Sequence, residues 1–254
     1  MFNEIIMAII QAATEFLPVS SDGHLALYSN LFYQPNLFFI TFLHIASLFA
    51  VLIYTKKEIR FLLTFSKEAQ KLWLYIIIAT IPGALLGFLA KDFIEQAFTS
   101  LLATGIGFLF TGTILLLTKF KPSKNTSRLN AKKSLFIGLM QALAPLPGVS
   151  RSGMTISTAL YNNVEREKAA KFSFLLFIPL AIGAFGLEFF DYYKGSIEMS
   201  IPILTLIISF VICFGLSILF LNLLTLIIKK DKFWMFSVYC YIIGIITLII
   251  YFLK

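Results

Sequence analysis

Charged side chains are scarce in this 254-residue sequence, where aspartate, glutamate, lysine and arginine together make up 13% of the residues. Soluble globular domains carry about 25%, so this composition excludes an ordinary soluble fold. Cysteine and histidine are scarcer still, with two of each. Cys213 and Cys240 lie in apolar segments without metal-ligand spacing, and we expect buried thiols rather than a metal centre.

Apolar residues are abundant instead, at 59% of the chain, and 28 residues are phenylalanine. Six apolar runs approach or exceed the roughly 20 residues with which a helix crosses a bilayer, at 37–54, 72–90, 101–118, 172–190, 201–228 and 233–253. The sequence therefore predicts an all-α integral membrane protein with about six full spans. The opening MFNEIIMAII has Glu4 and no basic region, so we expect no removable signal peptide.

Two further apolar segments, 2–29 and 134–160, are interrupted by turn residues around 18–23 and 145–153. If both are re-entrant, 17 of the 21 lysines and arginines fall on one side of the membrane, 3 fall on the other, and Arg151 remains. If 134–160 spans instead, the division is 13 against 7. The positive-inside rule thus predicts two re-entrant hairpins. It also predicts that the basic loops 56–71, 119–133, 161–171 and 229–232 are cytoplasmic, and it explains the net charge of +8 without nucleic-acid binding.

The two interrupted segments resemble each other at an offset of 130 residues. QAATEFLPVSSDGH (11–24) and QALAPLPGVSRSGM (141–154) match at Gln, Ala, Val, Ser and Gly, and Phe42 falls on Phe172. Because one hairpin enters from each side, we expect an inverted-topology repeat. Each half, about 1–120 and about 131–254 of a single membrane domain (1–254), is a re-entrant helix-turn-helix hairpin plus three transmembrane helices. Non-helical backbone at this depth lines a cavity or is buried in protein, so the two tips are expected to meet and form the site.

The second tip has the residue types of an oxyanion-binding turn. A glycine admits close approach of backbone, the following helix begins with free N–H groups, and a guanidinium forks onto two phosphate oxygens; the residues concerned are Gly148, Ser150, Arg151, Ser152 and Thr155. The alternative is structural: Arg151 pairs with Glu15 or with a backbone carbonyl and closes the bundle.

The first tip concentrates a carboxylate, hydroxyls and an imidazole within ten residues, at Glu15, Ser20, Ser21, Asp22 and His24. Such a set supplies a general base, a nucleophile and a proton donor, or ligands for a divalent cation. Singly, the serines and Asp22 are also ordinary helix caps and a histidine is often structural. Their depth in the membrane favours function. His44 stands in a full span without a nearby polar residue in the sequence, and we expect it to have a packing role.

Five stretches carry a family resemblance: TEFLPVSSDGH (14–24), FLHIASLFAVL (42–52), IPGALLG (81–87), IGLMQALAPLPGVSRSGMT (137–155) and VEREKAAKFSFLLFIPLAIGA (164–184). Over essentially the whole chain the sequence resembles the bacitracin-resistance type of undecaprenyl-diphosphate phosphatase. The resemblance implies a multi-pass hydrolase of the bacterial inner membrane. Its substrate is the lipid undecaprenyl diphosphate, and its product is the monophosphate carrier used in peptidoglycan and cell-wall synthesis.

The resemblance also implies roles for residues and a divalent cation, Mg²⁺ or Ca²⁺. The implied catalytic residues are Glu15, Ser21, His24 and Arg151, and the implied phosphate-binding residues are Ser150, Ser152 and Thr155. To the substrate-binding residues we add Ser20 and Gly148 from the two tips and Gln11; Glu15 and Asp22 are the candidate metal ligands. Two positions depart from the family pattern. Gln11 stands where many members have a glutamate, and Asp22 stands where a threonine or serine is common. For Asp22 we favour a helix cap over a metal ligand.

A transporter is the main alternative, because inverted repeats with midplane hairpins are typical of transporters. The same site would then move a polyprenyl phosphate across the bilayer without cleaving it. Arg151 and backbone amides suffice to bind an anion, so the cluster of Glu15, Ser21 and His24 favours hydrolysis. The sequence leaves open whether Ser21 or a water is the nucleophile, on which side the site opens, and the oligomeric state.

Overall fold

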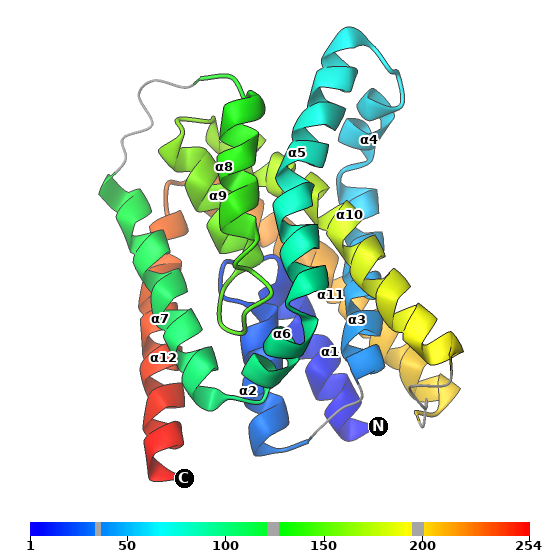
Figure 1. Ribbon diagram of the computed structural model, residues 1–254, viewed down its shortest axis with the longest axis vertical. Helices are drawn as coiled ribbons and strands as arrows, with labels where there is room; N and C mark the ends of the chain where they lie inside the picture. Colours follow the sequence, from blue (N-terminus) through cyan, green and yellow to red (C-terminus); the bar gives the residue numbers. More distant parts are fainter. Residues whose placement is uncertain (34–36, 121–126, 195–200) are drawn as a thin grey trace.

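A computed structural model describes residues 1–33, 37–120, 127–194 and 201–254 (Figure 1). Within these residues the chain is helical and has no strand, apart from an isolated bridge between Ser127 and Val164. The helices are α1 (Phe2–Glu15), α2 (Ser21–Leu31), α3 (Leu37–Tyr54), α4 (Lys56–Leu62), α5 (Lys67–Leu89), α6 (Lys91–Phe98), α7 (Leu101–Leu117), α8 (Ala131–Gln141), α9 (Arg151–Tyr161), α10 (Arg166–Tyr193), α11 (Ile203–Lys229) and α12 (Phe236–Leu253), with short 3₁₀ turns at Thr118–Phe120 and Phe233–Met235.

Among the described residues, five helices are long and apolar enough to cross a membrane: α5, α7, α10, α11 and α12. The spans of α7 and α12 each include the adjacent 3₁₀ turn, so that they cover Leu101–Phe120 and Phe233–Leu253. A sixth candidate is α3, which is bent by 75° from α4 after a short break. The break coincides with the change from an apolar run to Lys56 and Lys57, whose ammonium groups belong in water. The prediction of an all-α membrane protein with about six spans is confirmed.

Two helical hairpins enter the bundle from opposite ends (Figure 1). Helix α1 runs inward from the end that holds both termini and α2 returns to it, whereas α8 runs inward from the other end and α9 returns there. In each hairpin the returning helix begins after a serine cap: Ser20 accepts from the N–H of Gly23, and Ser150 accepts from the N–H of Gly153. The cap satisfies a backbone donor that would otherwise be unpaired inside the membrane.

The basic loops lie at the end of the bundle opposite the termini. Figure 1 shows α4, the start of α5 and the α9–α10 connection at that end. Lys121 and Lys124 of the expected cytoplasmic loop 119–133, and residues 195–199 of the opposite loop, lie outside the described residues. Helix α6, at the end of the bundle that holds the termini, was not predicted from the sequence. In KDFIEQAF the apolar residues recur every three to four positions, which is the pattern of an amphipathic helix.

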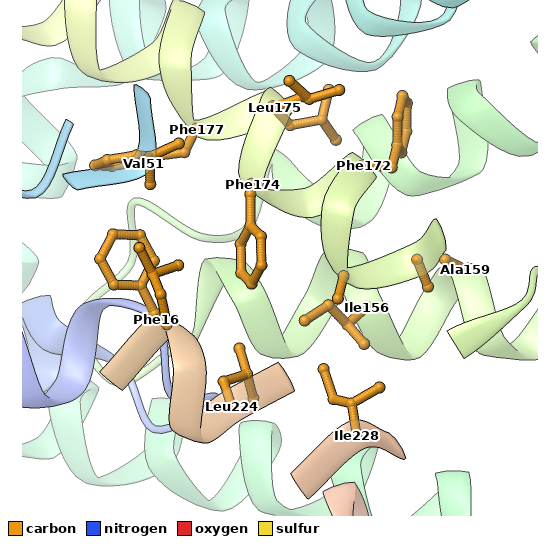
Figure 2. Packing of buried hydrophobic residues seen from close by; sticks show 14 of the residues in the cluster. Phe16, Val51, Ile156, Ala159, Phe172, Phe174, Leu175, Phe177, Leu224 and Ile228 are labelled. Carbon is orange, nitrogen blue, oxygen red and sulfur yellow. The ribbon is translucent and has the colours of Figure 1, made fainter. Parts of the chain in front are cut away.

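The packed interior lies beside the hairpin tips (Figure 2). Phe16 follows the last residue of α1, is fully buried, and meets Phe174 and Phe177 of α10 edge to face, with ring centroids 6.2 and 5.7 Å apart. Such edge-to-face pairs are the favoured geometry of aromatic rings. They fix the end of α1, and therefore Glu15, against α10.

Candidate active site

The two hairpin tips touch at a pair of glycines. A Cβ on Gly23 would lie 2.7 Å from the Cα of Gly148, and Gly148 itself has φ +86°. A Cβ on Gly148 would lie 2.3 Å from the carbonyl oxygen of Thr104 on α7. Only glycine accommodates both the contact and the left-handed backbone, so the sequence brings the start of α2 and the start of α9 together at this point.

Glu15, the last residue of α1, is the centre of the polar cluster. Its carboxylate is buried, with 7% of the residue exposed. One oxygen, Oε2, accepts hydrogen bonds from Ser21 Oγ at 2.6 Å and from Gln11 Nε2 at 3.0 Å. The other, Oε1, accepts from Arg151 Nη2 at 2.9 Å. The carboxylate is therefore held in place from both hairpins, and Gln11 serves it as a hydrogen-bond donor rather than as a second acid.

Arg151 begins α9 and points back toward the first tip. Besides its ion pair with Glu15, it donates from Nη1 to the carbonyl of Ser173 at 3.0 Å, and its guanidinium lies 4.5 Å from the ring centroid of Phe177. Both contacts of the structural alternative, with Glu15 and with a backbone carbonyl, are therefore present. Two nitrogens in these bonds leave further N–H donors on the fork, and Arg151 also lines a cavity.

The hydroxyls of the second tip mostly bond within the protein. Ser152 donates to the carbonyl of Leu17 at 3.2 Å, and Thr155 bonds to Ser173 Oγ at 2.7 Å. Ser150 and Arg151 line the cavity, whereas Gly148, Ser152 and Thr155 are absent from its lining. These last three residues hold the turn in shape.

The two histidines have exchanged the positions that the sequence analysis expected. His24 is absent from the cavity lining; its Nδ1 lies 2.7 Å from the carbonyl oxygen of Ser20, and its Nε2 lies 2.7 Å from the hydroxyl of Tyr239 on α12. His44 lines the cavity, with Nε2 at 3.4 Å from Glu15 Oε2 and 3.6 Å from Asp22 Oδ1. We expected a packing role for His44, and the structure instead places its ring in the cavity beside two carboxylates. An ionisable residue inside a span is a functional candidate by default.

Asp22 belongs to the same cluster. The capping role that we favoured is wrong, because the N-cap of α2 is Ser20. The Asp22 carboxylate lines the cavity and is one-third exposed, so it is available to a ligand.

A cavity of about 610 Å³ connects this cluster with the end of the bundle that holds the termini. Its deep part is polar, at Glu15, Ser21, Asp22, His44 and Arg151. Its middle runs between α5 and α10 past Gly83, Gly87, Leu180 and Gly183, and its outer part reaches Lys91, Glu95 and Glu188. Such a volume is typical of a small-ligand site. The lining includes no described residue of the basic loops.

The carboxylates of the cavity are the candidate ligands for the divalent cation that the resemblance implies. Among the described residues, no three His, Cys, Asp or Glu side chains are placed to hold a metal ion together. Mg²⁺, however, is commonly bound through one or two carboxylates together with substrate phosphates and water. Glu15 and Asp22, both facing the cavity, fit a cation held in that way.

A family model described as bacitracin resistance protein BacA matches residues 4–246. The chain belongs to this family. Relatives in the BacA family include proteins named undecaprenyl-diphosphatase from Thermosipho africanus and Bacteroides fragilis. They are 41% and 37% identical to this chain, over 96% and 98% of its length and over 98% and 97% of their own. A protein named undecaprenyl-diphosphatase 3 from Bacillus cereus is 38% identical over 97% of this chain and 96% of its own.

Proposed function

We propose that this chain hydrolyses undecaprenyl diphosphate to undecaprenyl phosphate and inorganic phosphate. The observation that carries the proposal is the hydrogen bond from Ser21 Oγ to Glu15, whose other oxygen is paired with Arg151. The hydroxyl of Ser21, the carboxylate of Glu15 and the guanidinium of Arg151 thus meet in the polar part of the cavity. The names of relatives at 33–41% identity support the same reaction.

Ser21 is the nucleophile in this proposal. As its Oγ bonds to the terminal phosphorus, Glu15 Oε2 takes the hydroxyl proton across the existing 2.6 Å hydrogen bond. The bond between that phosphorus and the bridging oxygen breaks, and undecaprenyl phosphate leaves. Water then attacks the phosphorus of the phosphoserine, and the bond between that phosphorus and Ser21 Oγ breaks as Oγ takes back the proton held by Glu15. The proton lost by the attacking water passes to solvent, and inorganic phosphate is released.

Charge stabilisation comes from the second hairpin. Arg151 and Ser150, at the start of α9, line the cavity together with Ser21, and the start of a helix favours an anion. Phosphoryl transfer depends mainly on such positioning and on neutralisation of oxygen charge. The ion pair with Glu15 fixes the orientation of the Arg151 guanidinium before substrate binds. The remaining N–H groups of Arg151 then donate hydrogen bonds to the oxygens of the diphosphate.

His44 and Asp22 complete the first side of the site. His44 Nε2 lies between Glu15 and Asp22, and its other nitrogen, Nδ1, bonds the carbonyl of Ile40 at 3.0 Å. The Nδ1 contact fixes the ring with Nε2 directed at the two carboxylates. A divalent cation, held by Glu15 and Asp22 with the substrate, would neutralise charge on the two phosphates.

The prenyl tail is proposed to lie in the middle of the cavity, between α5 and α10. Gly87 and Gly183 line this part, and a Cβ on either would have no heavy atom within 4 Å. Glycine is costly in a helix, and here close helix packing does not require it. These glycines keep open a passage for an apolar chain, and most of a long tail would remain in the bilayer because the cavity holds only a drug-sized volume.

The cavity is proposed to open at the outer face of the membrane. Its outer lining, including Lys91 and Glu95 with side chains 39% and 42% exposed, belongs to the end opposite the basic loops. With those loops cytoplasmic, a cysteine in place of Glu95 reacts with a membrane-impermeant maleimide in intact cells. A cysteine in place of Lys168, on the basic side and 73% exposed, reacts only after permeabilisation. The reverse pattern would overturn this orientation.

An inverted repeat also stays part of the proposal. Besides the matching serine caps, Gln11 and Gln141 are both buried, and within the described part of the chain each has a side-chain carbonyl oxygen without a hydrogen-bond partner. Helix α1 packs on α11, as α8 packs on α5, and α7 packs on α12. In the proposed repeat, α1 corresponds to α8, α5 to α11 and α7 to α12. The α1–α11 and α8–α5 contacts are then equivalent, and α7 and α12 pack on each other as an equivalent pair.

Transport of a polyprenyl phosphate is not supported. The relatives are named for hydrolysis, and the described cavity lining reaches one end of the bundle only. Reconstitution into liposomes tests the point: the wild type is expected to release phosphate from undecaprenyl diphosphate. Movement of intact lipid between leaflets with no phosphate release would contradict the proposal.

A further inference from the structure

Ser20 has a backbone conformation that needs external support. Its φ of 65° and ψ of 99° lie outside the regions that residues other than glycine normally adopt. Such a strained backbone persists only where the surroundings enforce it. Ser20 immediately precedes Ser21, so whatever holds its backbone also sets the position of the proposed nucleophile.

His24 supplies much of that support. The Ser20 carbonyl accepts from the backbone N–H of His24 at 3.2 Å and lies 2.7 Å from ring atom Nδ1. A carbonyl oxygen only accepts hydrogen bonds, so Nδ1 carries the proton. In the neutral ring Nε2 is then an acceptor, and it lies 2.7 Å from the hydroxyl of Tyr239, which donates to it.

Tyr239 belongs to a side of α12 that is docked on the first hairpin tip. Its ring lies nearly parallel to the ring of His24, with centroids 5.6 Å apart, and Phe108 meets the same imidazole edge-on at 5.0 Å. The next residue, Cys240, directs its Sγ to the carbonyl of Pro18 at 3.6 Å. Both nitrogens of His24 thus have partners, and two aromatic rings pack against the imidazole.

This geometry leaves His24 without a free nitrogen for the reaction. The ring is absent from the cavity lining, and the proton of Ser21 already has an acceptor in Glu15. We propose that His24 and Tyr239 are positioning residues, which hold the strained backbone of Ser20 and thereby place Ser21 Oγ against Glu15. The inference rests on the proposed phosphatase function and deepens it.

Asparagine separates a positioning role from proton transfer, because its side-chain amide can donate to the Ser20 carbonyl as Nδ1 does but cannot act as a base. We expect His24→Asn to keep phosphate release from undecaprenyl diphosphate within about tenfold of wild type. His24→Ala is expected to lose about 100-fold, as misplacement of a reacting group does. In both variants the loss falls on kcat, with KM nearly unchanged, since Arg151 and the start of α9 are untouched.

Tyr239→Phe provides a second, milder test that does not remove the imidazole. Loss of its hydrogen bond is expected to lower kcat about threefold to tenfold. Tyr241→Phe is the matched control: its hydroxyl lies on the same helix and bonds Thr113 of α7 at 3.1 Å rather than His24, so wild-type kinetics are expected.

Two results would overturn the inference in a folded, active protein: equal inactivity of His24→Asn and His24→Ala, or equal kinetics of Tyr239→Phe and Tyr241→Phe. The first would mean that the imidazole itself takes part in the chemistry. A wild type that releases no phosphate would instead overturn the proposed function, and this inference with it. Should His24→Ala fail to fold, the asparagine and tyrosine variants decide alone.

Discussion

The hydroxyl of Ser21 donates a 2.6 Å hydrogen bond to the carboxylate of Glu15, a residue that comes six positions earlier and lies on a different helix. The turn between α1 and α2 makes this contact, and Arg151 from the other hairpin holds the opposite oxygen of the same carboxylate. The proposed nucleophile, its proposed base and the guanidinium proposed to bind the diphosphate are therefore already in contact without substrate.

Replacement of Ser21 by alanine removes the proposed nucleophile. We expect phosphate release to fall by at least about 10³-fold, as loss of an attacking hydroxyl does in other hydrolases, with little change in thermal stability. Ser29→Ala is the control, because Ser29 lies on the same helix and its buried hydroxyl has no hydrogen-bond partner among the described residues. A Ser21→Ala variant with more than a tenth of wild-type activity would favour water as the nucleophile.

Replacement of Arg151 by alanine affects both activity and stability. Loss of one partner of a buried ion pair costs about 3–5 kcal/mol, and loss of a charge-stabilising donor costs about 10² to 10³ in rate. Adding Glu15→Gln should restore much of the melting temperature in detergent and none of the phosphate release. A fully stable Arg151→Ala variant would show that the pair with Glu15 does not hold the hairpins together.

His44 gives a prediction that the sequence alone did not. We expect His44→Ala to lower kcat about 10- to 100-fold, as loss of residues that orient catalytic groups does. His44→Gln is expected to retain more activity, because its amide N–H can still reach the carboxylates of Glu15 and Asp22. Wild-type kinetics for His44→Ala would return this residue to the packing role first expected.

The passage for the prenyl tail is tested by filling it. Gly87→Leu adds a side chain where a Cβ meets no heavy atom within 4 Å. The leucine side chain would occupy the space proposed for the prenyl tail and exclude it. We therefore expect kcat/KM to fall about tenfold for undecaprenyl diphosphate and to stay unchanged for farnesyl diphosphate, whose tail is short. Gly186→Leu is the control, because Gly186 is equally open yet absent from the cavity lining. Equal effects on both substrates would exclude this path for the tail.

The sequence predicted the fold because membrane insertion depends on features that are local in the chain. Apolar length and the placement of lysine and arginine suffice to predict spans and re-entrant hairpins. The pairing of Arg151 with Glu15 was likewise open to prediction, since a buried charge at such depth needs a partner.

The directions of side chains depend on packing that the sequence does not display. Ser21 and His24 are three residues apart on α2, yet one turns to Glu15 and the other to Tyr239, 215 residues later. His44 reaches the cavity because α3 packs beside α10 and α1, which no local pattern encodes. The cap of α2 was misassigned to Asp22, since both serine and aspartate are favoured caps.

The most direct test of the account is phosphate release from undecaprenyl diphosphate by the purified wild type and by Glu15→Gln, in detergent, with and without Mg²⁺ or Ca²⁺. The account predicts release by the wild type and loss of at least about 10²-fold in Glu15→Gln, which keeps the shape of the side chain but cannot take the proton of Ser21. Absence of release from folded wild type, or undiminished release from Glu15→Gln, would contradict it.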